Sequence, residues 1–74
     1  MEIVLVTRQG CHLCDEALAM LRSLGVDPQL QDVDSDGQLH SQYDWRVPVV
    51  LVDGRVVAEG RIDRKALAGA IQGS

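Results

Sequence analysis

The chain lacks both an excess of positive charge and a long apolar segment. Seven Lys and Arg residues stand against eleven Asp and Glu residues, giving a formal net charge of −4. This balance does not favour binding to nucleic acid or to an anionic membrane surface. The first apolar run, Ile3–Val6, is too short for a signal peptide or a membrane span. We therefore expect a cytoplasmic protein with no nucleic-acid or membrane partner.

Internal repeats, low-complexity segments and linkers are also missing, and 74 residues leave no room for a second domain. A chain this short buries only about 60 to 65% of the surface that its unfolded form exposes, so its core must be economical. We expect a single domain over residues 1–74, and a monomer.

Cysteine is scarce, and its placement is the most informative feature of the chain. Cys11 and Cys14 are the only two cysteines, and they lie between an apolar run and an amphipathic segment. Side chains three positions apart on the first turn of a helix have Cβ atoms about 5–6 Å apart, close enough to form a disulfide. A disulfide closing so small a loop stabilises a fold by only about 2 kcal/mol. In the cytoplasm, such a pair is expected to be catalytic or metal-binding rather than a permanent crosslink.

Hydrophobic periodicity predicts the first half of the fold. Residues 2–7 contain the continuous apolar run Ile3–Val6 and are rich in β-branched residues, which is typical of a strand buried on both faces. Apolar residues recur at helical spacing from His12 to Leu24. Gln29–Val33 alternates as a half-exposed edge strand does, and Leu30 and Val33 are expected to point inward.

The second half contains a short helix, a hairpin and a final helix. The hairpin is indicated by Asp53-Gly54, a type I′ turn signal, and the final helix by Asp63 as N-cap with Ile62 and Leu67 as a hydrophobic staple. The predicted elements are a helix at Gln38–Tyr43, strands at Val47–Val52 and Arg55–Ala58, and a helix from Asp63 to about Gln72.

The predicted order is β-α-β-α-β-β-α. The first two strands, joined by a helix, should be parallel with a right-handed crossover, and the hairpin adds two antiparallel strands. We therefore expect an α/β fold with a four-stranded mixed sheet flanked by helices.

A Cys-x-x-Cys at the first strand–helix junction, a Val-Pro opening the third strand, a Gly-turned hairpin and a final helix resemble the thioredoxin fold in its glutaredoxin-like form. The resemblance covers the whole chain. Within that superfamily, Gly10–Ala17 and Val47–Val49 are most similar to small bacterial glutaredoxin-like proteins. The resemblance implies a thiol–disulfide oxidoreductase acting in cell redox homeostasis.

The cysteines can be given separate roles. Cys11 stands at the helix start, where unpaired amides favour a thiolate, so we expect it to be the nucleophile and Cys14 the resolving thiol. Arg8 should support the thiolate, whereas the acidic residues that follow Cys14 should oppose it. His12 is expected to face solvent and to tune the potential of the pair.

The resemblance also implies a substrate groove. It predicts a cis Val47–Pro48 bond, with the backbone of Val47 pairing with an extended peptide or with glutathione. Glutaredoxins usually continue from the hairpin with two glycines, of which only Gly60 is present here. Glu59 brings a like charge toward a glutathione carboxylate, which Arg61 is expected to offset. The expected partner is a protein disulfide or glutathione, with glutathione as candidate co-substrate and no other cofactor.

Metal binding is the alternative use of the cysteines. A closed zinc site needs four ligands, and Cys11, His12 and Cys14 supply three at most, with His40 far along the chain. We therefore assign no metal ligands. An iron–sulfur cluster bridging two copies through Cys11 is the better metal hypothesis, and a redox-inactive binding module is the remaining alternative.

The remaining polar and aromatic residues have simpler interpretations. Tyr43 and Trp45 are the only aromatic residues, and we expect them to pack and anchor the loop that carries Pro48. His40 is expected at the surface. The acidic segment Asp32–Asp36 lacks the glycine and terminal glutamate of an EF-hand, which indicates a solvated turn.

Overall fold

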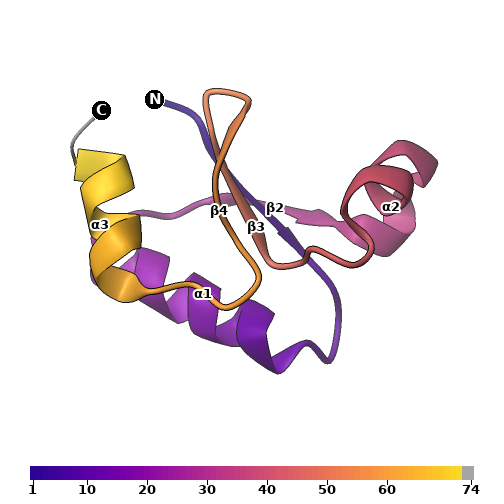
Figure 1. Ribbon diagram of the computed structural model, residues 1–74, viewed down its shortest axis with the longest axis horizontal. Coiled ribbons are helices and arrows are strands. Elements are labelled where there is room, and N and C mark those ends of the chain that lie inside the picture. The colour runs from indigo at the N-terminus through magenta and orange to yellow at the C-terminus, as the bar shows by residue number, and fades with distance from the viewer. Residues whose placement is uncertain (73–74) are drawn as a thin grey trace.

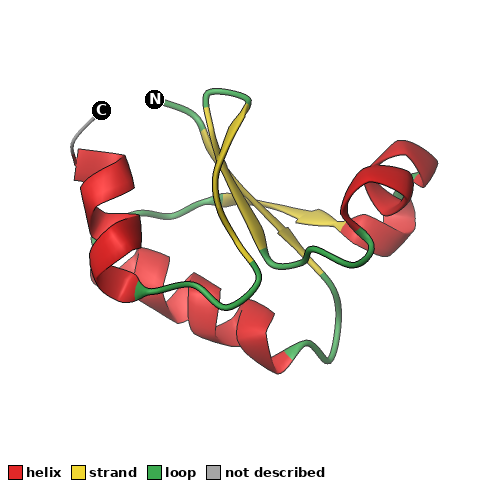
Figure 2. Ribbon diagram, in the orientation of Figure 1, coloured by secondary structure: helices red, strands yellow, loops and turns green. Residues whose placement is uncertain are grey.

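The computed structural model describes residues 1–72, in which helices lie on both faces of a central sheet (Figures 1 and 2). The elements are β1 (Ile3–Thr7), α1 (His12–Ser23), β2 (Gln29–Asp32), the 3₁₀ turn η1 (Val33–Ser35), α2 (Gly37–Tyr43), β3 (Val49–Val52), β4 (Arg55–Glu59) and α3 (Arg64–Gln72). Within these residues, no helix is both long and apolar enough to cross a membrane.

The sheet has the predicted mixed topology. Its strand order is β2-β1-β3-β4, with β1 parallel to β2 and antiparallel to β3, and β3 antiparallel to β4. The hairpin turn has positive φ at both Asp53 (51°) and Gly54 (83°), as a type I′ turn requires. The predicted element order and the edge position of β2 are therefore confirmed.

Two apolar clusters lie on opposite faces of the sheet, because successive side chains of β1 point to opposite sides. One cluster joins the sheet to α1 and α3 and contains Leu5, Ala17, Leu21, Val50, Ile62 and Leu67. The other lies toward η1 and α2 and contains Val4, Val6, Val33 and Val49. Figure 1 accordingly shows α1 and α3 together and α2 apart from them. Burial of β1 on both faces explains its continuous apolar sequence.

The start of α3 follows the predicted capping pattern. The Asp63 carboxylate accepts a hydrogen bond from the Ala66 amide at 3.1 Å. Ile62 and Leu67 are both buried in the same cluster, so the predicted staple is formed. These contacts fix where the chain leaves β4 and enters α3.

The inward position expected for Leu30 is wrong. Leu30 of β2 pairs with Leu5 of β1, but Leu30 is 50% exposed. The physical reason is its place on an edge strand, where it lines an open groove with Leu18 instead of lying under a helix. Val33 is fully buried, as expected, although it belongs to η1 and not to the strand.

The packing role expected for Trp45 is also wrong. Trp45 is 94% exposed, whereas Tyr43 packs against the second apolar cluster. The loop after α2 is held by its backbone, because the amides of Arg46 and Val47 both donate to the Tyr43 carbonyl, at 2.9 and 3.2 Å. This turn leaves Trp45 facing solvent.

Candidate functional site

The two cysteines lie at the beginning of α1, directly after β1. Cys11 is the N-cap residue, and its sulfur accepts a hydrogen bond from the Cys14 amide at 3.1 Å. The sulfur thus takes the place that a serine or aspartate oxygen usually has at a helix start. Gly10, with φ of 77°, allows the sharp turn that brings Cys11 to this position. Both thiols are free.

The two thiols have different surroundings. Cys11 is partly exposed, whereas Cys14 is 1% exposed. Burial raises the pKa of the Cys14 thiol above its ordinary value, and its contact with Cys11 raises it further. The pair therefore consists of an accessible outer sulfur and a buried inner thiol that tends to stay protonated.

The loop that carries Val47 and Pro48 is bonded to the end of β4. The Val47–Pro48 peptide bond is cis, and Pro48 is buried. The Gly60 amide donates to the carbonyls of Pro48 at 2.8 Å and Arg46 at 3.2 Å. Gly60 has φ of 68°, a conformation that glycine adopts without strain. Gly60 therefore connects this loop to the segment that continues to Arg61.

The Arg8 guanidinium binds two carboxylates. It donates to both oxygens of Asp34 at 2.9 Å and also pairs with the Asp44 carboxylate. These contacts raise the pKa of Arg8 and lower that of the Asp34 carboxyl. From the sequence, we expect Arg8 to support the Cys11 thiolate. In the structure, two carboxylates already compensate the charge of Arg8.

His40 completes this cluster. Its Nε2 lies 3.4 Å from an Asp44 oxygen and 3.9 Å from an Asp34 oxygen. Asp34, His40 and Asp44 offer three possible metal-ligand atoms within 4.8 Å of one another. The two carboxylates are already bound to the guanidinium of Arg8. This cluster could not be predicted from the sequence, because its members come from η1, from α2, from the loop after α2 and from the loop after β1.

Arg46 forms a second ion pair, with Glu59. Its Nε lies 3.1 and 3.2 Å from the two oxygens of Glu59, and its guanidinium carbon lies 5.2 Å from the centre of the Tyr43 ring. The pairing lowers the pKa of the Glu59 carboxyl. The sequence predicts that Arg61 offsets the charge of Glu59, whereas in the structure Arg46 does so.

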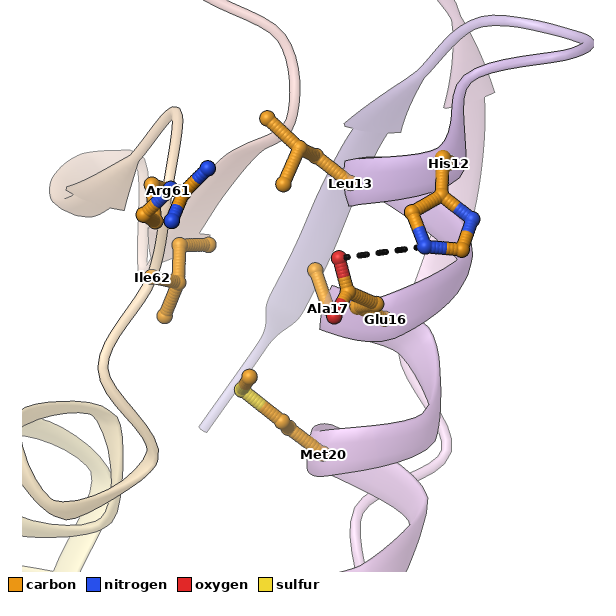
Figure 3. A pocket seen from close by; sticks show the side chains of 7 residues that line it. All are labelled: His12, Leu13, Glu16, Ala17, Met20, Arg61 and Ile62. Carbon is orange, nitrogen blue, oxygen red and sulfur yellow. Dashed lines mark ion pairs between the residues drawn. The ribbon is translucent and has the colours of Figure 1, made fainter.

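A groove with a volume of about 310 Å³ runs between α1 and the segment after β4 (Figure 3). Its walls are formed by His12, Leu13, Glu16, Ala17, Met20, Arg61 and Ile62. The His12 side chain is 88% exposed, and its Nε2 lies 3.8 Å from a Glu16 oxygen. Arg61 has no ion-pair partner within residues 1–72. His12 and Leu13 lie between the cysteines in sequence, so the groove reaches the start of α1, which carries the cysteine pair.

The structure thus connects the two loops that sequence analysis singled out. The Cys11 amide donates to the Arg8 carbonyl at 3.3 Å, and an Arg8 guanidinium nitrogen lies 3.4 Å from the Asp44 carbonyl. Asp44 begins the loop that leads to Val47 and Pro48. Arg8 therefore links the cysteine loop to the proline loop.

Comparison with known proteins finds a matching family model, similar sequences and similar structures. The model of the Glutaredoxin-like domain family (DUF836) matches residues 2–72. An uncharacterized protein of Mycobacterium tuberculosis (strain ATCC 25618 / H37Rv) is 39% identical over 79 residues, covering 95% of this chain and 81% of its own length. An X-ray structure of the target protein XcR50 from X. campestris superposes with a TM-score of 0.84 at 30% identity, covering 97% of each chain. The glutaredoxin from Archaeoglobus fulgidus superposes with a TM-score of 0.73 at 23% identity, covering 96% of this chain and 86% of that one.

Proposed function

The chain belongs to the glutaredoxin-like domain family and has the thioredoxin-like fold, and from this premise we propose that it is a thiol–disulfide oxidoreductase. The observation that supports the proposal most directly is the asymmetry of its cysteine pair. An accessible sulfur caps α1, and a buried thiol lies one turn further along the same helix. This arrangement separates a group that attacks a substrate from a group that reacts afterwards.

In the first step, the Cys11 thiolate attacks one sulfur of a substrate disulfide. A mixed disulfide forms between Cys11 and that sulfur, and the second substrate sulfur leaves as a thiolate that takes up a proton. The amides at the start of α1 favour negative charge on the Cys11 sulfur. The hydrogen bond from the Cys14 amide provides one such interaction.

In the second step, Cys14 loses its proton and attacks the Cys11 sulfur of the mixed disulfide. The remaining half of the substrate leaves as a thiol, and a Cys11–Cys14 disulfide forms, so two electrons pass from the pair to the substrate. Burial raises the pKa of Cys14, which favours its protonated form in the free protein. A further turnover needs an external thiol reductant.

The substrate is a protein disulfide or a glutathione mixed disulfide, bound beside the proline loop. Val47 would accept a hydrogen bond from an extended substrate at its carbonyl, because its amide already donates one to the Tyr43 carbonyl. His12 and Arg61 line the groove between α1 and the segment after β4, and the Gly60 amide bonds the proline loop to the start of that segment. A compartment that keeps thiols reduced, such as the cytoplasm, fits this activity.

The test is to trap the intermediate. The reduced Cys14→Ser variant, mixed with a peptide disulfide, should accumulate a mixed disulfide at Cys11, which mass spectrometry of the intact protein detects. Cys11→Ser should accumulate none, and the wild type should pass to the internal disulfide. A wild type that leaves the peptide disulfide intact, or a Cys11→Ser variant that reduces it as fast as the wild type, would contradict the proposal.

A further inference from the structure

The positive charges of the two loops are already paired within the protein. Arg8 makes two hydrogen bonds of 2.9 Å to Asp34 and a further ion pair to Asp44. Its side chain is one-third exposed, and both carboxylates lie beside the cysteine loop because they bind a residue of that loop. One guanidinium facing two carboxylates leaves this cluster with a net negative charge while His40 is neutral.

Arg46 is paired in the same way at the proline loop. Its Nε approaches both oxygens of Glu59, and the Tyr43 ring covers one face of its guanidinium. A substrate anion that approached Arg46 would have to displace the Glu59 carboxylate. The pair is close to neutral and therefore provides little attraction for an anion.

Additional carboxylates lie near the start of α1. Asp15 directly follows Cys14 and is exposed, and Glu16 lies on the groove of Figure 3, where His12 is its only ion-pair partner among residues 1–72. Arg61 is the one cation here without an ion-pair partner in the described part of the chain. The site therefore has three arginines against five carboxylates. They are Arg8, Arg46 and Arg61, and Asp15, Glu16, Asp34, Asp44 and Glu59.

From this charge distribution we infer that the site selects disulfides within positively charged peptide segments and discriminates against anionic ones. The inference rests on the proposed function and names its substrate class. An acidic surface attracts basic partners before contact and slows the approach of acidic ones. A basic flank also gains partners in Asp15 and Glu16, which have no guanidinium of their own among residues 1–72.

The test uses two peptides that carry the same disulfide to a neutral reporter thiol, flanked by two lysines in one and by two glutamates in the other. The rate of reporter release by the reduced protein is measured at low ionic strength. Each rate is divided by the rate with dithiothreitol, a neutral dithiol, which removes intrinsic differences between the disulfides. We expect the lysine peptide to react about tenfold faster, and added salt to reduce that ratio.

A pair of double variants assigns the effect to the site. Asp15→Asn with Glu16→Gln removes two negative charges beside the cysteines, and Glu2→Gln with Asp27→Asn removes two away from them. The first should lower the lysine-to-glutamate ratio at least threefold, and the second should leave it within twofold of the wild type. The ratio cancels any change in the reactivity of Cys11, because both peptides react with the same sulfur.

The outcomes separate the two proposals. If the glutamate peptide reacts as fast as the lysine peptide, or if both double variants change the ratio equally, the selectivity is wrong and the oxidoreductase activity stands. If neither peptide is reduced by protein whose thiols are free, the proposed function is wrong and the selectivity with it.

Discussion

The Cys14 amide donates a hydrogen bond to the Cys11 sulfur at 3.1 Å, so the first turn of α1 joins the two cysteines through the backbone. The same turn buries the Cys14 thiol and leaves the Cys11 sulfur partly exposed. The helix therefore arranges the pair before any substrate arrives.

The two thiols should react with an alkylating reagent at very different rates. Cys14 is 1% exposed and its pKa is raised, so little of its reactive thiolate meets the reagent near neutral pH. We expect Cys11 to be modified at least tenfold faster, as measured by peptide mass spectrometry after timed alkylation. In denaturant the two rates should converge. Equal rates in the folded protein would contradict the assigned environments.

Replacement of Asp34 should destabilise the protein only where its carboxyl is ionised. Its folded-state pKa is lowered by Arg8, so the contribution is fully present above the unfolded value of about 3.9 and is lost as pH falls through the folded value. Asp34→Asn should lower the urea midpoint at neutral pH, and this difference from the wild type should disappear in acid. Asp27→Asn, which removes an exposed carboxylate without an ion-pair partner among residues 1–72, is the control and should leave the urea midpoint at neutral pH close to the wild-type value. A difference that persisted unchanged in acid would exclude the ion pair as its source.

Leucine truncations at two positions should have very different costs. Leu21 is fully buried in the cluster between the sheet and the helices, so Leu21→Ala should reduce the free energy of unfolding by about 2–5 kcal/mol. Leu30 is half exposed, so Leu30→Ala should cost about 1 kcal/mol or less. Denaturant titration measures both. Similar losses would mean that Leu30 is covered in solution.

Two glycine-to-alanine changes should have opposite signs. Gly54 has φ of 83° in the β3–β4 turn, so Gly54→Ala should lower the free energy of unfolding by about 1–2 kcal/mol. Gly69 lies within α3, and apart from its chain neighbours and the helix backbone, no atom of residues 1–72 lies within 4 Å of the place that an alanine Cβ would take. Gly69→Ala should therefore raise the free energy of unfolding by about 0.5–1 kcal/mol. Thermal denaturation of both variants checks this, and destabilisation by Gly69→Ala would indicate a contact that α3 makes in solution.

Much of the fold could be predicted because its signals are local. The apolar run of β1 and the helical spacing in α1 depend only on neighbouring residues, and the Asp53-Gly54 turn needs only two positions. The cysteine spacing likewise places both thiols on one helical turn. These local features are present in the folded protein because the tertiary packing agrees with each of them.

The rest depended on contacts between distant segments. Arg8 binds Asp34 and Asp44, which are 26 and 36 positions away, and no local pattern specifies those partners. The exposure of Leu30 and Trp45 likewise depends on which element covers them, and an apolar or aromatic residue type does not decide that. The charges around the site could therefore not be predicted from local sequence patterns, whereas the positions of its two thiols could.

The two outer strands bear on how the folded protein behaves at high concentration. Exposed strand edges can pair with one another between molecules and start aggregation. Here β2 is four residues long and includes Gln29, Gln31 and Asp32, and β4 is five residues long with Arg55 and Glu59 at its ends. Short edges with polar and charged residues disfavour such pairing. The edges of the sheet that supports the cysteine pair are thereby protected against pairing with strands of a second molecule.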